Sequence, residues 1–325
     1  MPLGAHGPAR TGEGDLLIIG GAEDKLGKRT VLNEFVRRAG GADARIAVIP
    51  TASSLGPEII DVYAALFHKL GAAEVYGVRP EDRAQASSPE LVKELDRATG
   101  IFMTGGNQLK LSTVVAGTPF ADAIVEARAR GAVIGGTSAG ASIQSSHMVA
   151  FGPGGSTPKQ RMTQVAAGLG LVENCVIDQH FAQRNRYGRL LMIVAQSPQL
   201  LGIGVDEDTC AVITRESDDE VAGQVLRVIG RGSVTILDPA NIVSNASTRS
   251  FTNPAYGASI LPPGVTASAC GRLVRARSII SSSLARAVAM SGATSAVSGM
   301  LCQYFLGISF SIAFTLRRAG LKMLA

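Results

Sequence analysis

The chain has 325 residues, a formal net charge of +5, no tryptophan and only 5% aromatic residues. This length accommodates one large domain or two modest ones with an ample core. The positive charge belongs to the C-terminal part: residues 1–238 carry 26 acidic and 23 basic side chains, whereas residues 239–325 carry 8 basic and no acidic ones. The main body therefore gives no reason to expect nucleic-acid binding.

Cysteines and histidines are too scattered to predict a metal site or a disulfide framework. The four cysteines form no C-x-x-C pair, and the histidines do not cluster. We therefore expect reduced thiols, no metal and no organic cofactor. Residues 1–14 are polar and glycine-rich and lack the apolar segment of a signal peptide, which predicts a flexible N-terminus and a cytoplasmic location.

Short apolar runs, each followed by glycine, proline or threonine, alternate with segments that repeat apolar residues every three to four positions. The pattern indicates βαβ units around a largely parallel sheet, and hence an α/β fold. The predicted strands are 16–19, 46–49, 101–103 and 132–134, and the predicted helices are 28–39, 58–70 and 119–130. Further strands are expected at 203–205, 210–214, 224–229 and 234–237, with a solvated turn at 217–220.

Three glycine-rich segments, 20–23, 104–108 and 135–142, follow predicted strands. Ligand sites of open parallel sheets lie beyond the carboxyl ends of the strands, so we expect these segments to meet in one site. The third segment carries the G-x-S-x-G pattern of a nucleophile elbow, in which Ser138 would lie on a tight turn with its hydroxyl exposed. The helix after the turn would direct free N–H groups towards the site.

A serine nucleophile needs a base, and His180 is the best candidate among the four histidines. It lies in the segment 176–181, where an apolar, strand-like start is followed by polar residues, as at a strand end. His6 lies in the loose N-terminus, His68 in an amphipathic helix, and His147 near the predicted end of the helix after Ser138. An acid that orients the imidazole is offered by three carboxylates at the end of the next strand: Asp206, Glu207 and Asp208. Strand alternation would place Glu207 opposite the other two, and residue types alone do not choose among them.

The order serine, histidine, acid differs from that of α/β-hydrolases, which run serine, acid, histidine. Four motifs together instead resemble the cyanophycinase family of serine peptidases: Gly-Gly-Ala-Glu-Asp-Lys at 20–25, Thr-Gly-Gly-Asn-Gln-Leu at 104–109, Gly-Thr-Ser-Ala-Gly-Ala at 136–141 and Asp-Gln-His-Phe-x-x-Arg-x-Arg-x-Gly-Arg-Leu at 178–190. The resemblance runs from about residue 15 to residue 264. It implies a fold similar to class I glutamine amidotransferase domains, with a mostly parallel central sheet flanked by helices.

The resemblance also implies a Ser-His-Glu triad, which selects Glu207. It implies cleavage of cyanophycin, a polyaspartate with arginine on each β-carboxyl, to β-Asp-Arg dipeptides, and a homodimer. The family's substrate-binding residues carry over onto Gln108, Asp178, Gln179, Arg184, Arg186 and Arg189. The arginines would pair with substrate carboxylates, and Asp178 would receive a substrate guanidinium. Backbone N–H groups of Ala139 and of Gly105 or Gly106 would form the oxyanion hole.

Two alternatives stay open at this stage. One is a dipeptidase for short aspartyl peptides, and the other is a catalytically inactive, membrane-attached binding protein. Glutamine amidotransfer is disfavoured because that chemistry uses a cysteine at the position of Ser138.

The tail departs from the family pattern. Beyond Gly264 acids are absent and serine and alanine are dense, and residues 291–316 form an uncharged stretch of a length that spans a bilayer. A shifted reading frame would also explain the abrupt change in composition. We therefore expect a flexible segment at 1–14, a peptidase domain at 15–264 and an atypical tail at 265–325.

Overall fold

The computed structural model describes residues 12–159, 161–216, 223–243, 255–261, 265–270 and 273–278. The predicted turn at 217–220 and the uncharged stretch at 291–316 lie outside these residues. Gly14 and Glu13, assigned from the sequence to a flexible N-terminus, are held by Arg128 instead: the Gly14 N–H donates to its carbonyl, and the Glu13 carboxylate pairs with its guanidinium at 3.0 Å.

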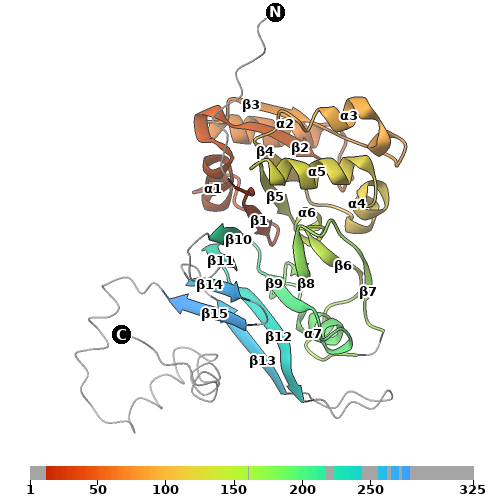
Figure 1. The fold of residues 1–325 in the computed structure, drawn as a ribbon, viewed down its shortest axis with the longest axis vertical. Coiled ribbons are helices and arrows are strands. Elements are labelled where there is room, and N and C mark those ends of the chain that lie inside the picture. Colours follow the sequence, from red (N-terminus) through yellow and green to blue (C-terminus); the bar gives the residue numbers. More distant parts are fainter. Residues whose placement is uncertain are drawn as a thin grey trace, which may run out of the picture. The chain divides into compact units, whose positions relative to one another are not determined.

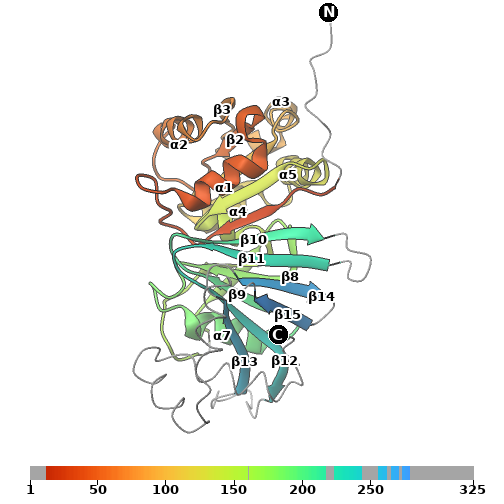
Figure 2. The ribbon, with the colours of Figure 1, turned by 90° about the vertical axis from the view of Figure 1, so that its left-hand side faces the viewer.

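Within the described residues, the first sheet has nine strands in the order β15-β14-β11-β10-β1-β5-β4-β2-β3 (Figure 1). Strands β1, β5, β4, β2 and β3 are parallel to one another, whereas β10, β11 and β14 extend the sheet from β1 by antiparallel pairing. Figure 2 shows β10, β11, β14 and β15 side by side. Their bounds are β1 Leu16–Ile19, β2 Arg45–Ile49, β3 Glu74–Gly77, β4 Gly100–Met103, β5 Val133–Thr137, β10 Thr209–Glu216, β11 Gly223–Gly230, β14 Val265–Cys270 and β15 Leu273–Ser278.

The second sheet, in the part of the chain that the structure describes, has six strands in the order β13-β12-β9-β8-β6-β7. Its centre, β6, β8 and β9, is parallel, and β7 and β12 pair antiparallel with its two sides. The bounds are β6 Ser145–Phe151, β7 Gln164–Ala167, β8 Val172–Gln179, β9 Leu201–Val205, β12 Val234–Val243 and β13 Ala255–Leu261.

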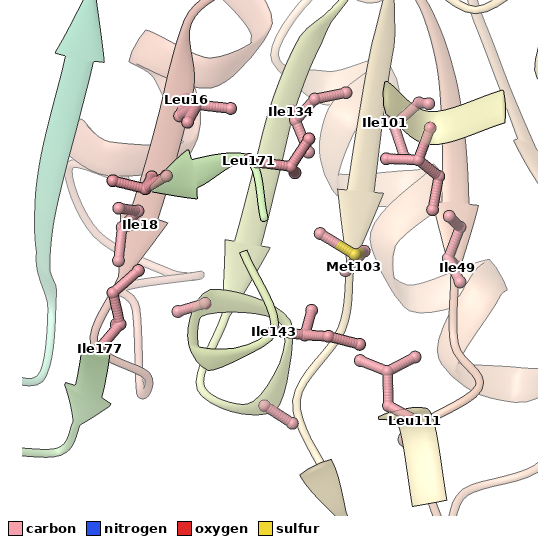
Figure 3. Close-up of a cluster of buried hydrophobic side chains, with 14 of the residues drawn as sticks. Leu16, Ile18, Ile49, Ile101, Met103, Leu111, Ile134, Ile143, Leu171 and Ile177 are labelled. Carbon is pink, nitrogen blue, oxygen red and sulfur yellow. The ribbon is translucent and has the colours of Figure 1, made fainter. Parts of the chain in front are cut away.

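Helices cover both faces of the first sheet, as expected for parallel strands buried on both sides. Side chains of α1 and α2 pack on one face with alternate residues of β1 and β2, such as Leu17 and Val48. The opposite face packs against α4, α5 and α6 and also against residues of the second sheet, including Ile177 (Figure 3). The other face of the second sheet packs on α7. The helices are α1 Thr30–Ala39, α2 Glu58–Lys69, α3 Pro89–Lys93, α4 Gln108–Val115, α5 Pro119–Ala129, α6 Ala139–Ser142 and α7 Tyr187–Gln196.

Most predicted elements occur within two residues of the expected positions. The helix predicted after Ser138 is α6, a single turn that ends at Ser142, after which β6 begins. His147 therefore lies on a strand, not near a helix end as expected from the sequence. The strands β14 and β15 extend the first sheet beyond Gly264, where the sequence places the end of the domain.

Candidate active site

The order β1-β5-β4 brings the three glycine-rich segments together at the carboxyl ends of adjacent strands. The strands end in register, because Ile19 pairs with Thr137 and Met103 pairs with Gly136. The expectation that these segments meet in one site is therefore confirmed. Ser138 follows the middle strand, β5, and has a neighbouring loop on each side.

Ser138 has an unusual backbone conformation, with φ 53° and ψ −107°. A conformation of this kind costs about 1–3 kcal/mol and persists only where the surroundings hold it. Here the Ser138 N–H donates to the Ile19 carbonyl at 3.0 Å, which ties the turn to β1. A Cβ on Gly140 would lie 2.2 Å from the Met103 carbonyl oxygen, so only glycine permits this close approach of α6 to β4.

His180 and Glu207 complete a line of hydrogen bonds that begins at Ser138. The Ser138 Oγ lies 3.0 Å from His180 Nε2, and His180 Nδ1 lies 2.6 Å from Glu207 Oε1. His180 follows β8 and Glu207 follows β9, two adjacent parallel strands of the second sheet. The hydroxyl and the imidazole thus come from different sheets.

The loop after β1 joins the two sheets at this point. The His180 N–H donates to the Gly20 carbonyl at 2.7 Å, and the Asp208 N–H donates to the Gly21 carbonyl at 2.9 Å. A Cβ on Gly21 would lie 2.3 Å from His180 Cε1, so the imidazole rests directly on this glycine. His180 itself has φ 48°, a second strained residue beside the strained serine.

The pKa of His180 lies below its usual value, mainly because burial disfavours the imidazolium. The hydrogen bond and the charge of Glu207 oppose this shift, whereas the cations of Arg184 and Arg186 add to it. The imidazole is therefore neutral near pH 7, as a general base requires. With Nδ1 turned to a carboxylate, Nε2 is the nitrogen free to accept the hydroxyl proton.

The three consecutive carboxylates have three different partners. Asp206 is buried and accepts hydrogen bonds from the Ala182 N–H and from the N–H and hydroxyl of Ser233. Asp208 accepts from the Asp24 N–H. Only Glu207 faces the imidazole, and its own N–H donates to the Gln183 side chain at 3.0 Å. Strand β9 ends at Val205, so strand alternation does not extend to these residues.

Three backbone N–H groups near Ser138 have no acceptor within the described residues: those of Gly105, Gly106 and Ala139. Ala139 is the first residue of α6, whose N–H lacks a partner within the helix. A Cβ on Gly105 would lie 3.9 Å from the Ser138 Oγ, which places this backbone beside the hydroxyl. These donors suit an oxygen that becomes negatively charged.

Asp178 is fully buried and binds two arginines from the segment after His180. Arg189 donates Nε to Oδ2 at 2.6 Å and Nη2 to Oδ1, and Arg186 donates Nη1 to Oδ1 at 3.1 Å. Arg186 Nη1 also donates to Gln179 Oε1 at 2.7 Å, and Gln179 Nε2 donates to Gln108 Oε1 at 2.8 Å. The sequence motif thus forms one connected polar network.

This network corrects one expectation from the sequence. Asp178 has no exposed surface, and both of its oxygens are occupied by arginine, so direct contact with a substrate guanidinium conflicts with the arrangement. Arg186 and Arg189 are also buried, whereas Arg184 is exposed and Gln108 is half-buried. Burial lowers the pKa of Arg186 to about 10, which leaves it protonated at neutral pH.

Glu23 is a buried acidic residue to which the sequence analysis assigned no role. Its carboxylate accepts hydrogen bonds from Thr137, Tyr63 and Lys25. The motif at 20–25 contained it, but a single sequence does not reveal that this glutamate turns inwards below Ser138. Asp24, the next residue, instead accepts from the N–H groups of Leu26, Gly27 and Arg29 and shapes the loop.

Among the described residues, the other histidines and cysteines offer no further site. His68 lies in the last turn of α2, with Nδ1 3.1 Å from the Ala72 carbonyl oxygen, and His147 is exposed. Cys175 and Cys210 are buried free thiols. Across the described residues, no cluster of histidine, cysteine, aspartate or glutamate has the arrangement of a metal site. In the same part of the chain, no helix combines the length and apolarity needed to cross a membrane.

Comparison with known proteins finds relatives for most of the chain. The model of Peptidase family S51 matches residues 16–221. Cyanophycinase from Nostoc sp. is 43% identical over 229 residues, which cover 70% of this chain and 74% of that protein. Cyanophycinase from Thermosynechococcus vestitus is 41% identical over 245 residues, which cover 75% and 72%.

A crystal structure of a peptidase from an acI-B1 Actinobacterium has the same fold. It matches with a TM-score of 0.58 and 23% identity, and the match covers 79% of this chain and 97% of that one. Together with the family match, this similarity confirms the predicted α/β fold, similar to class I glutamine amidotransferase domains.

Proposed function

This chain belongs to peptidase family S51 and is a serine-type hydrolase, and we propose that it hydrolyses cyanophycin to β-Asp-Arg dipeptides. Support for the substrate comes from relatives that are named cyanophycinases and match about 70% of this chain. The observation that carries the mechanism is the line of hydrogen bonds from Ser138 through His180 to Glu207, with distances of 3.0 and 2.6 Å.

In the first step, the Ser138 Oγ attacks a carbonyl carbon of the aspartate backbone. His180 Nε2 takes the hydroxyl proton as the new C–O bond forms, and the carbonyl electrons move onto oxygen. Glu207 stabilises the imidazolium through Nδ1. The intermediate then collapses: its C–N bond breaks, the leaving amine takes the proton from Nε2, and an acyl-enzyme ester remains.

We propose that the N–H groups of Gly105, Gly106 and Ala139 form the oxyanion hole. They lack protein acceptors and lie on both sides of the turn that carries Ser138. One such donor typically lowers the activation free energy by about 3–4 kcal/mol. The turn itself then acts as a nucleophile elbow, since its strained backbone holds Oγ between the donors and the base.

In the second step, water attacks the ester and His180 Nε2 accepts its proton. The Ser138 Oγ leaves with that proton, and the product departs as a carboxylic acid that loses its remaining proton to solvent and becomes a carboxylate. The depressed pKa of His180 suits this cycle because the base returns to its neutral form at neutral pH.

The exposed arginine of the 178–190 motif is the proposed contact for the polymer. Each cyanophycin unit carries a free α-carboxylate on its arginine, and the Arg184 guanidinium can pair with it bidentately. Gln108 is half-buried and would contribute an amide. Gln179, Arg186 and Arg189 would shape the wall of the site through their bonds to Asp178 rather than leave it to reach substrate.

The proposal includes a homodimer and a peptidase domain over about residues 15–264, both implied by the family resemblance. It also includes a cytoplasmic location, which the sequence predicts because residues 1–14 lack the apolar segment of a signal peptide. Sedimentation of the purified chain tests the dimer. None of these three features enters the chemistry above, because every residue of the proposed triad comes from one chain.

The first experiment incubates purified protein with insoluble cyanophycin and identifies the soluble products by mass spectrometry. We expect β-Asp-Arg from the wild type and none from S138A, which should still bind the polymer. Turnover by folded S138A would overturn the serine mechanism. Cleavage of short aspartyl peptides without release from polymer would instead favour the dipeptidase alternative.

A further inference from the structure

Glu23 is a buried acid near Ser138 that the mechanism above does not use. It lies in the loop after β1 and is 4% exposed. Its Oε2 accepts the Thr137 hydroxyl at 2.5 Å, and its Oε1 accepts the Tyr63 hydroxyl at 2.6 Å and the Lys25 ammonium at 2.7 Å. The donors come from β5, α2 and the loop itself, so one carboxylate joins three separate segments.

The charge on Glu23 is maintained despite its burial. Burial alone would raise the pKa of this carboxyl, but the Lys25 ammonium and the hydrogen bonds from Lys25, Thr137 and Tyr63 lower it below its ordinary value. An ionised carboxylate only accepts hydrogen bonds, so it can serve three donors at once. The hydroxyl-bearing residues Thr137 and Tyr63 are themselves buried, and each would lose its acceptor if Glu23 were removed.

Thr137 is the partner that connects Glu23 to the chemistry. It is the last residue of β5 and immediately precedes Ser138, whose φ of 53° makes the turn sensitive to how the preceding residue is held. Backbone pairing with β1 holds Thr137 on one side. The hydrogen bond from its hydroxyl to Glu23 ties the Thr137 side chain to the loop after β1. The same loop contacts His180 through Gly20 and Gly21.

We propose that Glu23 is a positioning residue: by holding Thr137, it fixes the turn that presents the Ser138 Oγ to His180. The proposal rests on the function of Ser138 as the nucleophile. Glu23 makes no bond to Ser138 or His180 and takes no proton in the reaction. Its effect is on the distance and direction between the nucleophile and its base.

A matched set of variants tests this role in the full-length protein. T137V removes the hydroxyl at nearly constant volume, T137S retains it, and Y63F removes a different donor from the same carboxylate. E23Q retains the size of the side chain but removes its charge and one acceptor oxygen. Thermal unfolding of each variant measures the purely structural part of its effect.

The decisive readout is the rate at which a fluorophosphonate labels Ser138, because this rate reports the nucleophile without polymer binding. We expect T137V and E23Q to slow labelling and to lower kcat by about ten- to a hundredfold, with KM nearly unchanged, since misplacement of about 1 Å can cost a hundredfold. T137S should label at nearly the wild-type rate. Y63F should melt earlier but label like the wild type, because its Thr137–Glu23 bond remains.

The outcomes separate this proposal from the proposed function. If the wild type is not labelled at Ser138, the serine mechanism is wrong and the role of Glu23 falls with it. If the wild type is labelled and folded T137V labels equally fast, the serine mechanism stands and the positioning role is wrong. Equal slowing in Y63F and T137V would also contradict it, because loss of either bond would then act only through general stability. If E23Q does not fold, comparison of the labelling rates of T137V and T137S still tests the positioning role.

Discussion

The two sheets position their residues of the candidate active site by different kinds of interaction. Ser138 and the three free N–H groups lie at the end of the nine-stranded sheet, where backbone pairing and close glycine contacts set the geometry. His180 and Glu207 extend from the six-stranded sheet, beside a network of buried charges around Asp178.

This difference separates two kinds of sensitivity. Residues held by backbone geometry respond to changes of shape, whereas residues held by charge respond to pH and to the loss of an ionic partner. The Ser138–His180 hydrogen bond joins a residue of the nine-stranded sheet to a residue of the six-stranded sheet, so catalytic activity depends on both sheets. Measurements of stability and of pH dependence can distinguish the contribution of each sheet.

The largest expected effect comes from the acid of the six-stranded sheet. E207Q should lower kcat by about 10²- to 10⁴-fold, because the amide no longer stabilises the imidazolium. D206N is the matched control: Asp206 binds Ala182 and Ser233 and does not face the imidazole, so this variant should melt earlier yet retain most of its kcat. Similar losses of kcat in the two variants would contradict the assignment of Glu207.

The next effect is on stability and concerns the buried ionic network. D178N leaves Arg186 and Arg189 without their shared carboxylate, and such a loss typically costs about 3–5 kcal/mol. Urea unfolding measures this change. E34Q is a suitable comparison, because the Glu34 pairs with Arg37 and Arg38 lie nearer the surface and should contribute about 1 kcal/mol or less. If D178N unfolds like the wild type, the network does not hold this sheet.

A subtler effect is on pH dependence. Since the pKa of His180 is lowered, mainly by burial and further by the Arg184 cation, the acid limb of kcat/KM should lie below pH 6.5. R184A should move this limb to higher pH, because removing the cation makes the imidazolium easier to form. R184K keeps a positive charge and should leave the limb in place. A limb that is unmoved by R184A would show that Arg184 has no electrostatic influence on the base.

The smallest effect is local to the loop after β1. Hydrogen bonds from three backbone N–H groups, those of Arg29, Gly27 and Leu26, lower the pKa of Asp24 to about 2. The stabilisation of the loop by the ionised Asp24 carboxylate is therefore present above pH 4 and is lost as the pH falls through 2. D24A should speed hydrogen exchange of these amides at neutral pH and leave global unfolding almost unchanged. If exchange in the loop is unaltered, contacts other than Asp24 maintain its shape.

Much of the first sheet was predictable because its strands are short apolar runs that end at glycine or proline. Strand β3 was not predicted, since its sequence Glu-Val-Tyr-Gly lies at the sheet edge, where partial exposure permits a weak pattern. The meeting of the three glycine-rich segments was also predicted correctly, because parallel strands place their carboxyl ends at one edge.

Side-chain partnership was harder to predict. Nothing in the residue types indicates that Asp178 binds Arg186 and Arg189 internally while Arg184 remains exposed, because burial depends on where α7 packs. Nor does the sequence distinguish Glu23, which turns inwards, from Asp24, which shapes the loop. Both choices depend on contacts with residues far away along the chain.

The pairing of β1 with β10 has a consequence for biosynthesis. Leu16 pairs with Ile213, so the strand made first waits for about 200 further residues before one of its edges is covered. At 5–20 residues per second, a ribosome needs roughly 10–40 s to supply them. Throughout that interval the nascent chain presents Leu-Leu-Ile-Ile with an unpaired edge, the kind of segment that invites aggregation. Soluble expression should therefore fall sharply for any fragment that stops before β10.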